Sequence, residues 1–365
     1  MRVLHVSAGN LYGGIERILV EIASVDGGAG RHEFALSFEG RAADDLRTAG
    51  ATVTVLGSAR FSRPWSVWRA RRRLASIVNA GRYQAVVCHA PWSYGLAAPV
   101  VPGAARVFWA HDASDGRHWT ERRVQAERPC LAICNSQYTA NALRRWLPGA
   151  RLEVIYAPVA PAPATETIRR DVRREMGTVD ATTVFVIASR FERWKGHLDL
   201  LRAAARLHGD WSVWIAGGPQ RASEDAYARD IRDEIAHLAI DARVRLLGDR
   251  PDVRRVLRGA DVHVQPNATP EPFGLAFVEA LDAGLPVITT AGGGALEIVT
   301  AECGILVAPG DLDALTSALQ RMIDDSALRL RLGAAGPARA AALCDPAAQL
   351  RRLDEALSAA CGAAT

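Results

Sequence analysis

Two glutamates, Glu271 and Glu279, stand eight residues apart in the stretch Glu-Pro-Phe-Gly-Leu-Ala-Phe-Val-Glu. Glu271 lies in a Pro-rich loop, and the apolar pattern predicts a helix that starts near Gly274 and contains Glu279. If the interval is mostly helical, it spans roughly 12 Å. The helix N-terminus between the two carboxylates offers N–H groups and a dipole that favour a diphosphate. The segment therefore fits a sugar, its phosphates and a ribose, although the spacing taken alone favours two solvated glutamates beside a core helix.

Two cations follow the first predicted strand of the second half of the chain. Arg190 and Lys195 belong to the loop between a strand at Thr183–Ala188 and a helix at Leu198–Leu207. Such a loop lies at the carboxyl end of a parallel sheet, where α/β folds bind ligands. Two cations at that edge suit a pyrophosphate leaving group. The alternative is an ordinary basic surface loop.

A glycine-containing loop follows the first predicted strand of the chain, Arg2–Val6, and leads into a predicted helix. Its sequence is Gly9-Asn10-Leu11-Tyr12-Gly13-Gly14, which is neither the G-x-G-x-x-G fingerprint nor a Walker A loop. A nicotinamide-dependent dehydrogenase is therefore disfavoured. The loop either presents backbone N–H groups to an anion or is simply a tight strand-to-helix turn.

Alternating short strands and helices predict an α/β protein with two mostly parallel sheets. Three prolines in residues 157–164 suit a stiff linker. We therefore expect an N-terminal Rossmann-like domain over residues 1–160 and a second over 165–345. Asp345-Pro346 fits the start of a closing helix, residues 346–365, which we expect to pack back on the first domain. The predicted strands are Glu33–Phe38, Thr52–Leu56, Ala85–Cys88, Arg106–Trp109, Leu131–Cys134, Leu152–Ile155, Ser212–Ala216, Val244–Leu247, Val262–Gln265, Pro286–Thr289 and Gly304–Val307.

Composition limits the class of protein. The 365 residues are 49% hydrophobic and 23% charged, with a net charge of +4, which excludes a disordered chain and gives no sign of nucleic-acid binding. Six cysteines form no C-x-x-C pair, so we expect reduced thiols and a cytoplasmic protein without a metal site. No signal peptide is visible. Residues 83–105 lack charged side chains, but their prolines favour a buried strand, loop and helix over a membrane span.

Residues 60–82 contain seven arginines and no acidic residue. Val67, Ala70, Leu74 and Ile77 form a helical apolar stripe in this segment. Together with Trp65 and Trp68, the arginines fit a peripheral helix on an anionic membrane, at the inner face of the cell membrane. The alternative is a solvated surface helix that packs on the sheet.

The ordered set of motifs resembles the large family 4 of retaining glycosyltransferases with the GT-B fold, over nearly the whole chain. Glu271-x7-Glu279 with Phe273-Gly274 resembles the E-x7-E signature, and Arg190 and Lys195 match the phosphate-binding pair. The further matches, in family order, are Gly13-Gly14-x-Glu16, Trp109-Ala110-His111-Asp112, Asn135-Ser136, Gly292-Gly293, Glu297 and Pro309-Gly310-Asp311. One departure is Tyr156-Ala157-Pro158-Val159 where the family often shows Asn-Gly.

The resemblance implies a GT-B enzyme with two Rossmann-like domains whose sheets face a central cleft. Glu271 would bind hydroxyls of the donor sugar, Glu279 those of the ribose, and Arg190 and Lys195 the departing diphosphate. His111 would contact an outer hydroxyl of the transferred sugar. The other implied donor-binding residues are Gly13, Gly14, Gly217, Leu247, Gly248, Phe273, Gly274 and Leu275. The implied acceptor contacts are Asn10, Asp112, His118 and Trp119.

The implied reaction is transfer of a hexose, with retention, from a UDP- or GDP-linked donor to a saccharide, lipid-linked or small-molecule hydroxyl in bacterial glycan or glycoconjugate biosynthesis. The protein cations and helix dipoles would neutralise the diphosphate, so we expect no metal and no cofactor. The oligomeric state is left open. Two alternatives stay open as well: another GT-B activity, such as a nucleotide-sugar epimerase or a phosphorylase, and a non-catalytic nucleotide-sugar-binding protein.

Overall fold

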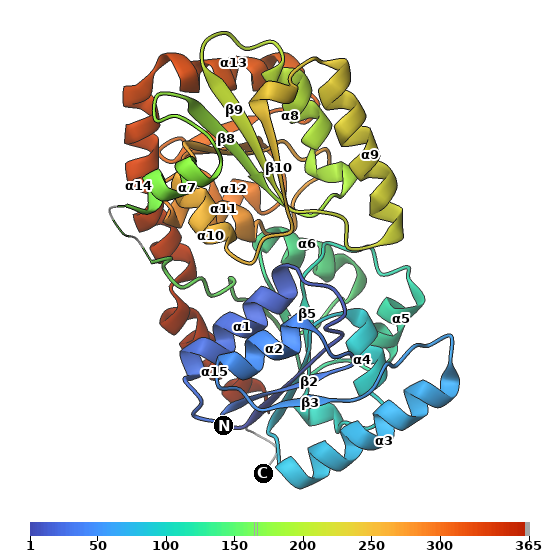
Figure 1. Ribbon diagram of the computed structural model, residues 1–365. Coiled ribbons are helices and arrows are strands. Elements are labelled where there is room, and N and C mark those ends of the chain that lie inside the picture. The colour runs from blue at the N-terminus through green and yellow to red at the C-terminus, as the bar shows by residue number, and fades with distance from the viewer. Residues whose placement is uncertain (164, 166, 362–365) are drawn as a thin grey trace. The chain divides into compact units, whose positions relative to one another are not determined.

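The computed structural model describes residues 1–163, 165 and 167–361. The chain forms two compact units, Met1–Ala160 with Cys344–Thr365, and Pro161–Leu343. Each unit contains one parallel sheet with helices against it (Figure 1). Ala164, at the end of the predicted linker, and residues 362–365, at the end of the predicted closing helix, lie outside the described residues.

The first unit contains a seven-stranded parallel sheet in the order β3-β2-β1-β4-β5-β6-β7. Its strands are β1 Val3–Ser7, β2 His32–Leu36, β3 Val53–Val55, β4 Ala85–Cys88, β5 Arg106–Ala110, β6 Leu131–Cys134 and β7 Leu152–Val154. The strand order reverses direction between β1 and β4. The loops that follow these two strands therefore border a topological switch point, the usual ligand position in open α/β sheets.

Helices cover this sheet and include the end of the chain. They are α1 Gly14–Asp26, α2 Arg41–Thr48, α3 Pro64–Gly81, α4 Pro91–Ala97, the 3₁₀ turn η1 Gly103–Ala105, α5 Trp119–Ala126, α6 Gln137–Trp146 and α15 Pro346–Cys361. Asp345 begins α15, because its Oδ1 accepts from the Ala348 N–H at 2.7 Å. Leu350, Leu353 and Leu357 are buried, and α15 packs against α1 (Figure 1).

The second unit contains a six-stranded parallel sheet in the order β10-β9-β8-β11-β12-β13. Its strands are β8 Thr183–Ala188, β9 Trp211–Ala216, β10 Val244–Gly248, β11 Val262–Gln265, β12 Val287–Thr290 and β13 Gly304–Val307. Its helices are α7 Ile168–Glu175, η2 Arg193–Lys195, α8 His197–Ala204, α9 Ala222–His237, η3 Asp241–Arg243, α10 Val253–Gly259, α11 Leu275–Asp282, α12 Ala295–Ile298, α13 Leu312–Asp324 and α14 Ser326–Cys344. Here the order reverses between β8 and β11.

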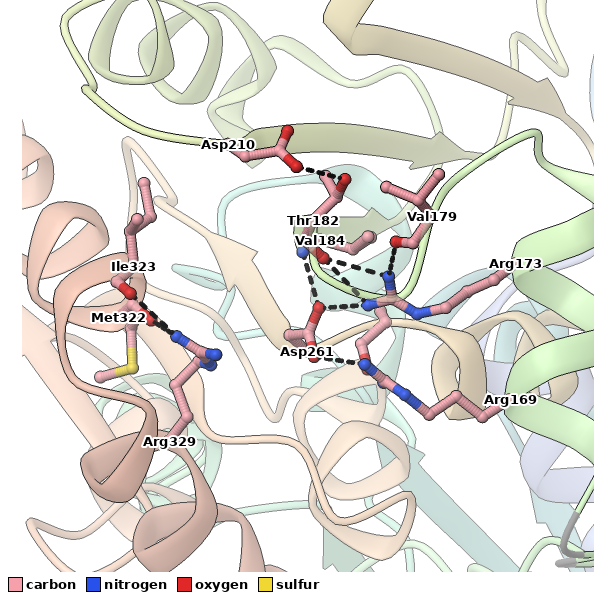
Figure 2. A network of polar contacts seen from close by, with 11 residues as sticks. Arg169, Arg173, Val179, Thr182, Val184, Asp210, Asp261, Met322, Ile323 and Arg329 are labelled. Atoms are coloured by element: carbon pink, nitrogen blue, oxygen red, sulfur yellow. Dashed lines mark hydrogen bonds and ion pairs between the residues drawn. The ribbon is translucent and has the colours of Figure 1, made fainter.

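A partly buried ion-pair network ties β8 and β11 together at their amino ends (Figure 2). Asp261, just before β11, accepts from Arg173 Nη2 at 2.5 Å and from the Val184 N–H of β8 at 2.7 Å. Arg169 Nη2 contacts the other carboxylate oxygen at 2.8 Å. Burial lowers the pKa of the Arg173 guanidinium, whose side chain is 1% exposed. Because α7 supplies both arginines, the network holds β8 beside β11, and both strands deliver their following loops to the same opposite edge.

The apolar stripe of α3 faces the core. Val67, Ala70, Leu74 and Val78 are buried, whereas Ile77 is only partly buried, so Val78 and not Ile77 ends the buried stripe. Trp65 and Trp68 are 56% and 59% exposed. The expected amphipathic helix is therefore present, with its aliphatic side packed on the sheet and its indoles outside.

The described part of the chain holds no helix with both the length and the apolar character needed to cross a bilayer. None of the six cysteines forms a disulfide, and all six lie within the described residues.

Candidate active site

The loops after β8 and β11 meet at the switch point of the second unit. The Ala268 N–H donates to the Trp194 carbonyl at 2.7 Å, and Lys195 Nζ lies 2.8 Å from Glu271 Oε2. A cation and an acid that the sequence suggested separately are therefore in direct contact. They lie at the carboxyl edge of the sheet, where ligands bind.

One oxygen of the Glu271 carboxylate carries the contacts that hold it. Oε2 accepts from Lys195 Nζ at 2.8 Å, Asn267 Nδ2 at 3.1 Å and Gln265 Nε2 at 3.2 Å. Within the described part of the chain, each side-chain hydrogen bond found for this carboxylate falls on Oε2. The side group is 10% exposed. Oε1 is thus left to accept from a ligand hydroxyl while Oε2 fixes the orientation of the carboxylate.

The backbone of Glu271 rests on a glycine pair. Glu271 forms a parallel bridge with Gly293, and its carbonyl accepts from the Gly294 N–H at 2.7 Å. Gly293 has φ +64, and a Cβ at that position would overlap with the Glu271 carbonyl. Only glycine allows this close approach without strain. The Gly292-Gly293 motif therefore positions the acidic loop.

Glu279 lies in the second turn of α11, which starts at Leu275. Residues 271–274 lie outside the helix and residues 275–279 inside it, so the helical-rise distance applies only to the second part of the interval. The N-cap, Gly274, has φ +111 and no side chain to cap the first turn. The first-turn N–H groups are thus uncapped by a side chain, which suits an anion. Glu279 is 2% exposed, and Arg254 Nε lies 3.3 Å from its Oε1.

Arg190 also has acidic partners. Its Nη2 contacts Glu224 and, at 3.3 Å, Glu192 Oε1, and its side chain is 20% exposed. Burial raises the pKa of Glu224, but hydrogen bonds from the Gln220 N–H and from Arg190 lower it. The lowering outweighs the rise, so the pKa of Glu224 lies below its ordinary value. Arg190 is therefore oriented by a carboxylate in the same way as Lys195.

Three other predicted donor-binding residues lie at the ends of β9 and β10. The Gly217 N–H donates to the Gly248 carbonyl at 2.8 Å, and Leu247 precedes Gly248 in β10. Gly217 has φ +139, and a Cβ there would overlap with the Ser189 carbonyl. Gly217 thus lies beside the start of the loop that carries Arg190. Phe273 is 4% exposed.

In the first unit, Gly13 is the N-cap of α1, and its N–H donates to Glu16 Oε2 at 3.1 Å. The Gly13 N–H is therefore engaged in a hydrogen bond within the first turn of α1. Gly14 is the first helical residue. Asn10 is exposed in the preceding loop.

The other first-unit residues fall into two groups of contacts. His111 and Asp112 directly follow β5, and the His111 carbonyl accepts from Asn135 Nδ2 at 2.9 Å. His118 is the N-cap of α5, with Nδ1 2.6 Å from Thr120 Oγ1. Trp119 is 50% exposed and packs edge-on against Phe61. Among the described residues, the ring contacts place His111 with Trp109 and Trp119 with Phe61, in separate groups.

Four residues of the second-unit site were not singled out from the sequence: Glu224, Arg254, Gln265 and Asn267. Gln265 and Asn267 adjoin the acidic segment, so their proximity to Glu271 was a usable signal. Glu224 and Arg254 come from α9 and α10, and nothing in their local sequence links them to Arg190 or Glu279. Among the described residues, no three His, Cys, Asp or Glu side chains are grouped to hold a metal ion.

Two family models match the chain one after the other. The one described as Glycosyltransferase Family 4 matches residues 12–162, and the one described as Glycosyl transferases group 1 matches residues 168–339. Together they extend over both units.

Curated relatives carry glycosyltransferase names. The D-inositol 3-phosphate glycosyltransferase of Corynebacterium kroppenstedtii is 36% identical over 182 residues, 47% of this chain and 40% of the relative. That of Corynebacterium diphtheriae is 29% identical over 253 residues, 66% of this chain and 58% of the relative. A GDP-mannose-dependent monoacylated alpha-(1-6)-phosphatidylinositol monomannoside mannosyltransferase of Corynebacterium glutamicum is 31% identical over 186 residues, 48% of this chain and 47% of the relative. The chain thus spans about half the length of these relatives.

Solved structures match the fold over nearly the whole chain. HepE of Anabaena, crystallised with UDP and glucose, has a TM-score of 0.87 at 24% identity and covers 98% of this chain and 100% of its own. Sucrose-phosphate synthase of Thermosynechococcus elongatus has a TM-score of 0.82 at 20% identity and covers 100% of both chains. The chain belongs to the family 4 glycosyltransferases and has their GT-B fold.

Proposed function

We propose that the protein is a retaining hexosyltransferase that moves a hexose from a UDP- or GDP-linked donor to a glycan, lipid-linked or small-molecule hydroxyl. The observation that carries the proposal is the contact between Lys195 and Glu271 at the switch point of the second sheet. An acid that binds sugar hydroxyls beside a cation that binds phosphate suits a site where a sugar–phosphate bond is cleaved.

Each side chain has one task in this proposal. Glu271 accepts a hydrogen bond from a donor-sugar hydroxyl through Oε1, while Oε2 stays on Lys195, Asn267 and Gln265. Lys195, Arg190 and the N-terminus of α11 stabilise the negative charge of the leaving diphosphate. Glu279 accepts from ribose hydroxyls. His111 and the Gly14 N–H belong to the first unit, and their roles toward the donor follow from the family motifs.

Cleavage of the anomeric C–O bond builds positive charge on the sugar and negative charge on the phosphate. We propose a front-face displacement in which the leaving phosphate takes the proton of the acceptor hydroxyl, with net retention. Protein cations and a helix N-terminus supply the charge that a metal ion supplies elsewhere, so transfer proceeds without one. Unchanged rates in excess EDTA and an α-linked product from an α-linked donor by NMR are the expected results.

The base and the sugar are distinguished by binding. Thermal unfolding is measured with UDP, GDP, ADP, dTDP and NAD. A ligand at 100 times its dissociation constant raises the free energy of unfolding by about 2.7 kcal/mol, which is readily detected. The proposal expects a shift with UDP or GDP and none with NAD, whereas a shift with NAD alone would reject it.

The variants Glu271→Ala and Glu279→Ala separate the sugar end of the site from the nucleotide end. Glu271→Ala is expected to remove transfer while nucleotide binding stays, and Glu279→Ala to weaken nucleotide binding itself. Turnover of the donor without any acceptor would instead indicate an epimerase. Donor binding without turnover in any acceptor panel would indicate a non-catalytic binding protein.

The first unit carries a basic surface with exposed indole rings. A hollow of about 540 Å³ lies between α3 and α5, with Arg71, Arg122 and Arg123 beside Phe61 and Trp119 in its lining. On α3 the guanidinium of Arg69 stacks over Trp65, and that of Arg72 over Trp68. We propose that this basic, indole-bearing face contacts anionic membranes.

Flotation with liposomes tests this contact. Binding is expected with anionic vesicles and not with neutral ones, and a Trp65→Ala and Trp68→Ala double variant should bind less. Equal binding to anionic and neutral vesicles would contradict the electrostatic membrane contact. It would leave the proposed transferase activity unaffected.

A further inference from the structure

Four buried histidines form one continuous row across the sheet of the first unit. They come from four neighbouring strands, in the order β2, β1, β4 and β5: His32 begins β2, His5 lies in β1, His89 follows β4 and His111 follows β5. Their exposed fractions are 1%, 0%, 0% and 8%.

The row is joined end to end by hydrogen bonds. His32 Nδ1 lies 2.9 Å from His5 Nε2, His5 Nδ1 lies 2.8 Å from His89 Nε2, and His89 Nδ1 lies 3.0 Å from His111 Nε2. At the His32 end, Nε2 lies 3.2 Å from Asp354 Oδ1 on α15, a close charge contact that does not have the geometry of a hydrogen bond. At the other end, His111 Nδ1 is buried and has no hydrogen-bond partner among the described residues.

Proton counting restricts a row of four neutral rings to two patterns. A neutral imidazole has one N–H, which donates, and one bare nitrogen, which accepts. Each ring-to-ring contact needs one of each. If one ring turned its tautomer alone, two N–H groups or two lone pairs would face each other. Four neutral rings therefore all carry their proton on Nε2, or all carry it on Nδ1. A His32 ring protonated on both nitrogens would instead place the single proton of His5, His89 and His111 on Nδ1.

The interior of the row favours neutral rings. Burial lowers the pKa of His5 and His89 well below their ordinary value, and it lowers the pKa of His111 to about 3. The uncharged groups around them are aromatic: His5 stacks on Phe34, and His89 and His111 stack on Trp109.

The charged groups gather at the His32 end. Asp354 Oδ2 faces Arg31 Nη1 at 3.5 Å, and Asp26 accepts from Arg31 Nε at 2.9 Å and from the backbone N–H of His32 at 3.3 Å. A carboxylate accepts hydrogen bonds and cannot donate them. The negative charge 3.2 Å away therefore favours a proton on His32 Nε2 over a lone pair there.

We propose that His32 is neutral and that Asp354, on the C-terminal helix, sets the tautomer of His111 through this row, so that every ring carries its proton on Nε2 and His111 Nδ1 is a bare acceptor. Asp354 is then a positioning residue that acts through three intervening histidines. The last step, in which a ligand hydroxyl donates to His111 Nδ1, rests on the proposed transferase function. The tautomer pattern itself does not.

The test uses the full chain without ligand, labelled with ¹⁵N on histidine. Long-range ¹H–¹⁵N spectra report which ring nitrogen of each histidine carries the proton. We compare the wild type with Asp354→Asn and with Glu355→Gln. Both variants replace one carboxylate on α15 by its amide, and Glu355 is exposed. The amide introduced by Asp354→Asn can donate to His32 as well as accept, so the preference for one pattern is lost.

The expected wild-type spectrum shows Nε2–H on all four rings, unchanged in Glu355→Gln. In Asp354→Asn, Nδ1–H signals are expected to appear along the row. An Nδ1–H signal from His5, His89 or His111 in the wild type would overturn the proposal. So would an Asp354→Asn spectrum, from a variant with unchanged thermal unfolding, that matches the Glu355→Gln spectrum. If Asp354→Asn does not fold, the wild-type pattern alone decides. Because no sugar nucleotide is present, none of these outcomes depends on whether the protein transfers a sugar.

Discussion

The two units contain sheets with the same kind of switch point, yet the chemistry at the two edges differs. At the edge of the second sheet, Lys195 and Arg190 keep partly exposed charges that carboxylates hold in place. Beside the first sheet, four imidazoles are buried and joined to one another. Parallel α/β topology places a ligand site at the end of the sheet. The residues that follow the strands determine whether that site binds its ligand through charges or through neutral hydrogen bonds. Charges suit a diphosphate, and neutral acceptors suit hydroxyl groups.

Removal of the charge at the second edge should have the largest effect. Lys195→Ala takes away a cation at the leaving group and leaves the Glu271 carboxylate without its ion-pair partner. We expect kcat/KM to fall roughly 100- to 1,000-fold, the range for losing one preorganised electrostatic contact. Steady-state transfer assays with the donor found by the nucleotide panel measure it.

Arg193→Ala is the matched control, because Arg193 lies in the same short turn with a 66% exposed side chain that pairs with Asp230. Its activity should stay close to that of the wild type. Equal losses in the two variants would mean that the turn as a whole, and not the Lys195 charge, matters.

The glycine pair behind Glu271 should matter next. Gly293→Ala introduces a Cβ at φ +64 against the Glu271 carbonyl, whereas Gly310→Ala introduces one at φ +77 where no atom lies within 4 Å. We expect Gly310→Ala to lower the free energy of unfolding by about 1–2 kcal/mol, the cost of left-handed backbone. Gly293→Ala should cost about 1–3 kcal/mol more, because the neighbouring backbone must move. Denaturant unfolding measures both, and equal values would show that the Glu271 loop yields freely.

Glu279 tests whether the second edge binds the nucleotide through more than its phosphates. Glu279→Gln keeps the shape of the side chain but weakens its acceptor strength and its pairing with Arg254. We expect the dissociation constant of the preferred nucleotide to rise about 10-fold, equivalent to about 1.4 kcal/mol. Calorimetric titration with the nucleoside diphosphate provides the value, and unchanged affinity would remove Glu279 from the nucleotide site.

Buried histidines should make stability fall in acid. The pKa of His111, His197 and His263 is lowered by burial to about 3, against 6.5 for an ordinary histidine. Between these values the unfolded chain binds protons that the folded chain does not, so stability falls as the pH falls from 6.5 toward 3. Each ring contributes about 1.4 kcal/mol per pH unit within this window.

His263→Phe measures the contribution of one ring outside the row. His263 packs edge-on against Phe277, and its ring nitrogens have no hydrogen-bond partner among the described residues. Between pH 3 and 6.5, the variant should reduce the slope of unfolding free energy against pH by the contribution of one histidine, about 1.4 kcal/mol per pH unit. A slope equal to that of the wild type would show that His263 is not held neutral.

Much of the second-unit site was visible in the sequence because its parts are local. A predicted strand followed by Arg190 and Lys195, and another followed by Glu271, place these residues at one edge of any parallel sheet. In the sheet β8 and β11 are neighbours, although β9 and β10 lie between them in the sequence. This pairing is seen only in the tertiary structure. So are the contacts of Arg254 with Glu279 and of Glu224 with Arg190, since their partners lie on other elements.

The row of histidines shows the limit most clearly. In the sequence, His5, His32 and His89 are single polar residues in or beside apolar strands, a pattern typical of core histidines. Only the strand order β2-β1-β4-β5 puts their rings in line, and only the return of α15 to the first unit brings Asp354 to the end of that line.

The sequence by itself determined the alternation of strands and helices, the two parallel α/β units and the short motifs that mark the family, because these depend on periodicity and on residues close together in the chain. Tertiary structure alone decided which strands are neighbours, which oxygen of Glu271 accepts the side-chain hydrogen bonds and which histidines are hydrogen-bonded to one another. Those features depend on contacts between segments that are distant in the sequence, and each set of contacts forms only when the sheet of its own unit is assembled.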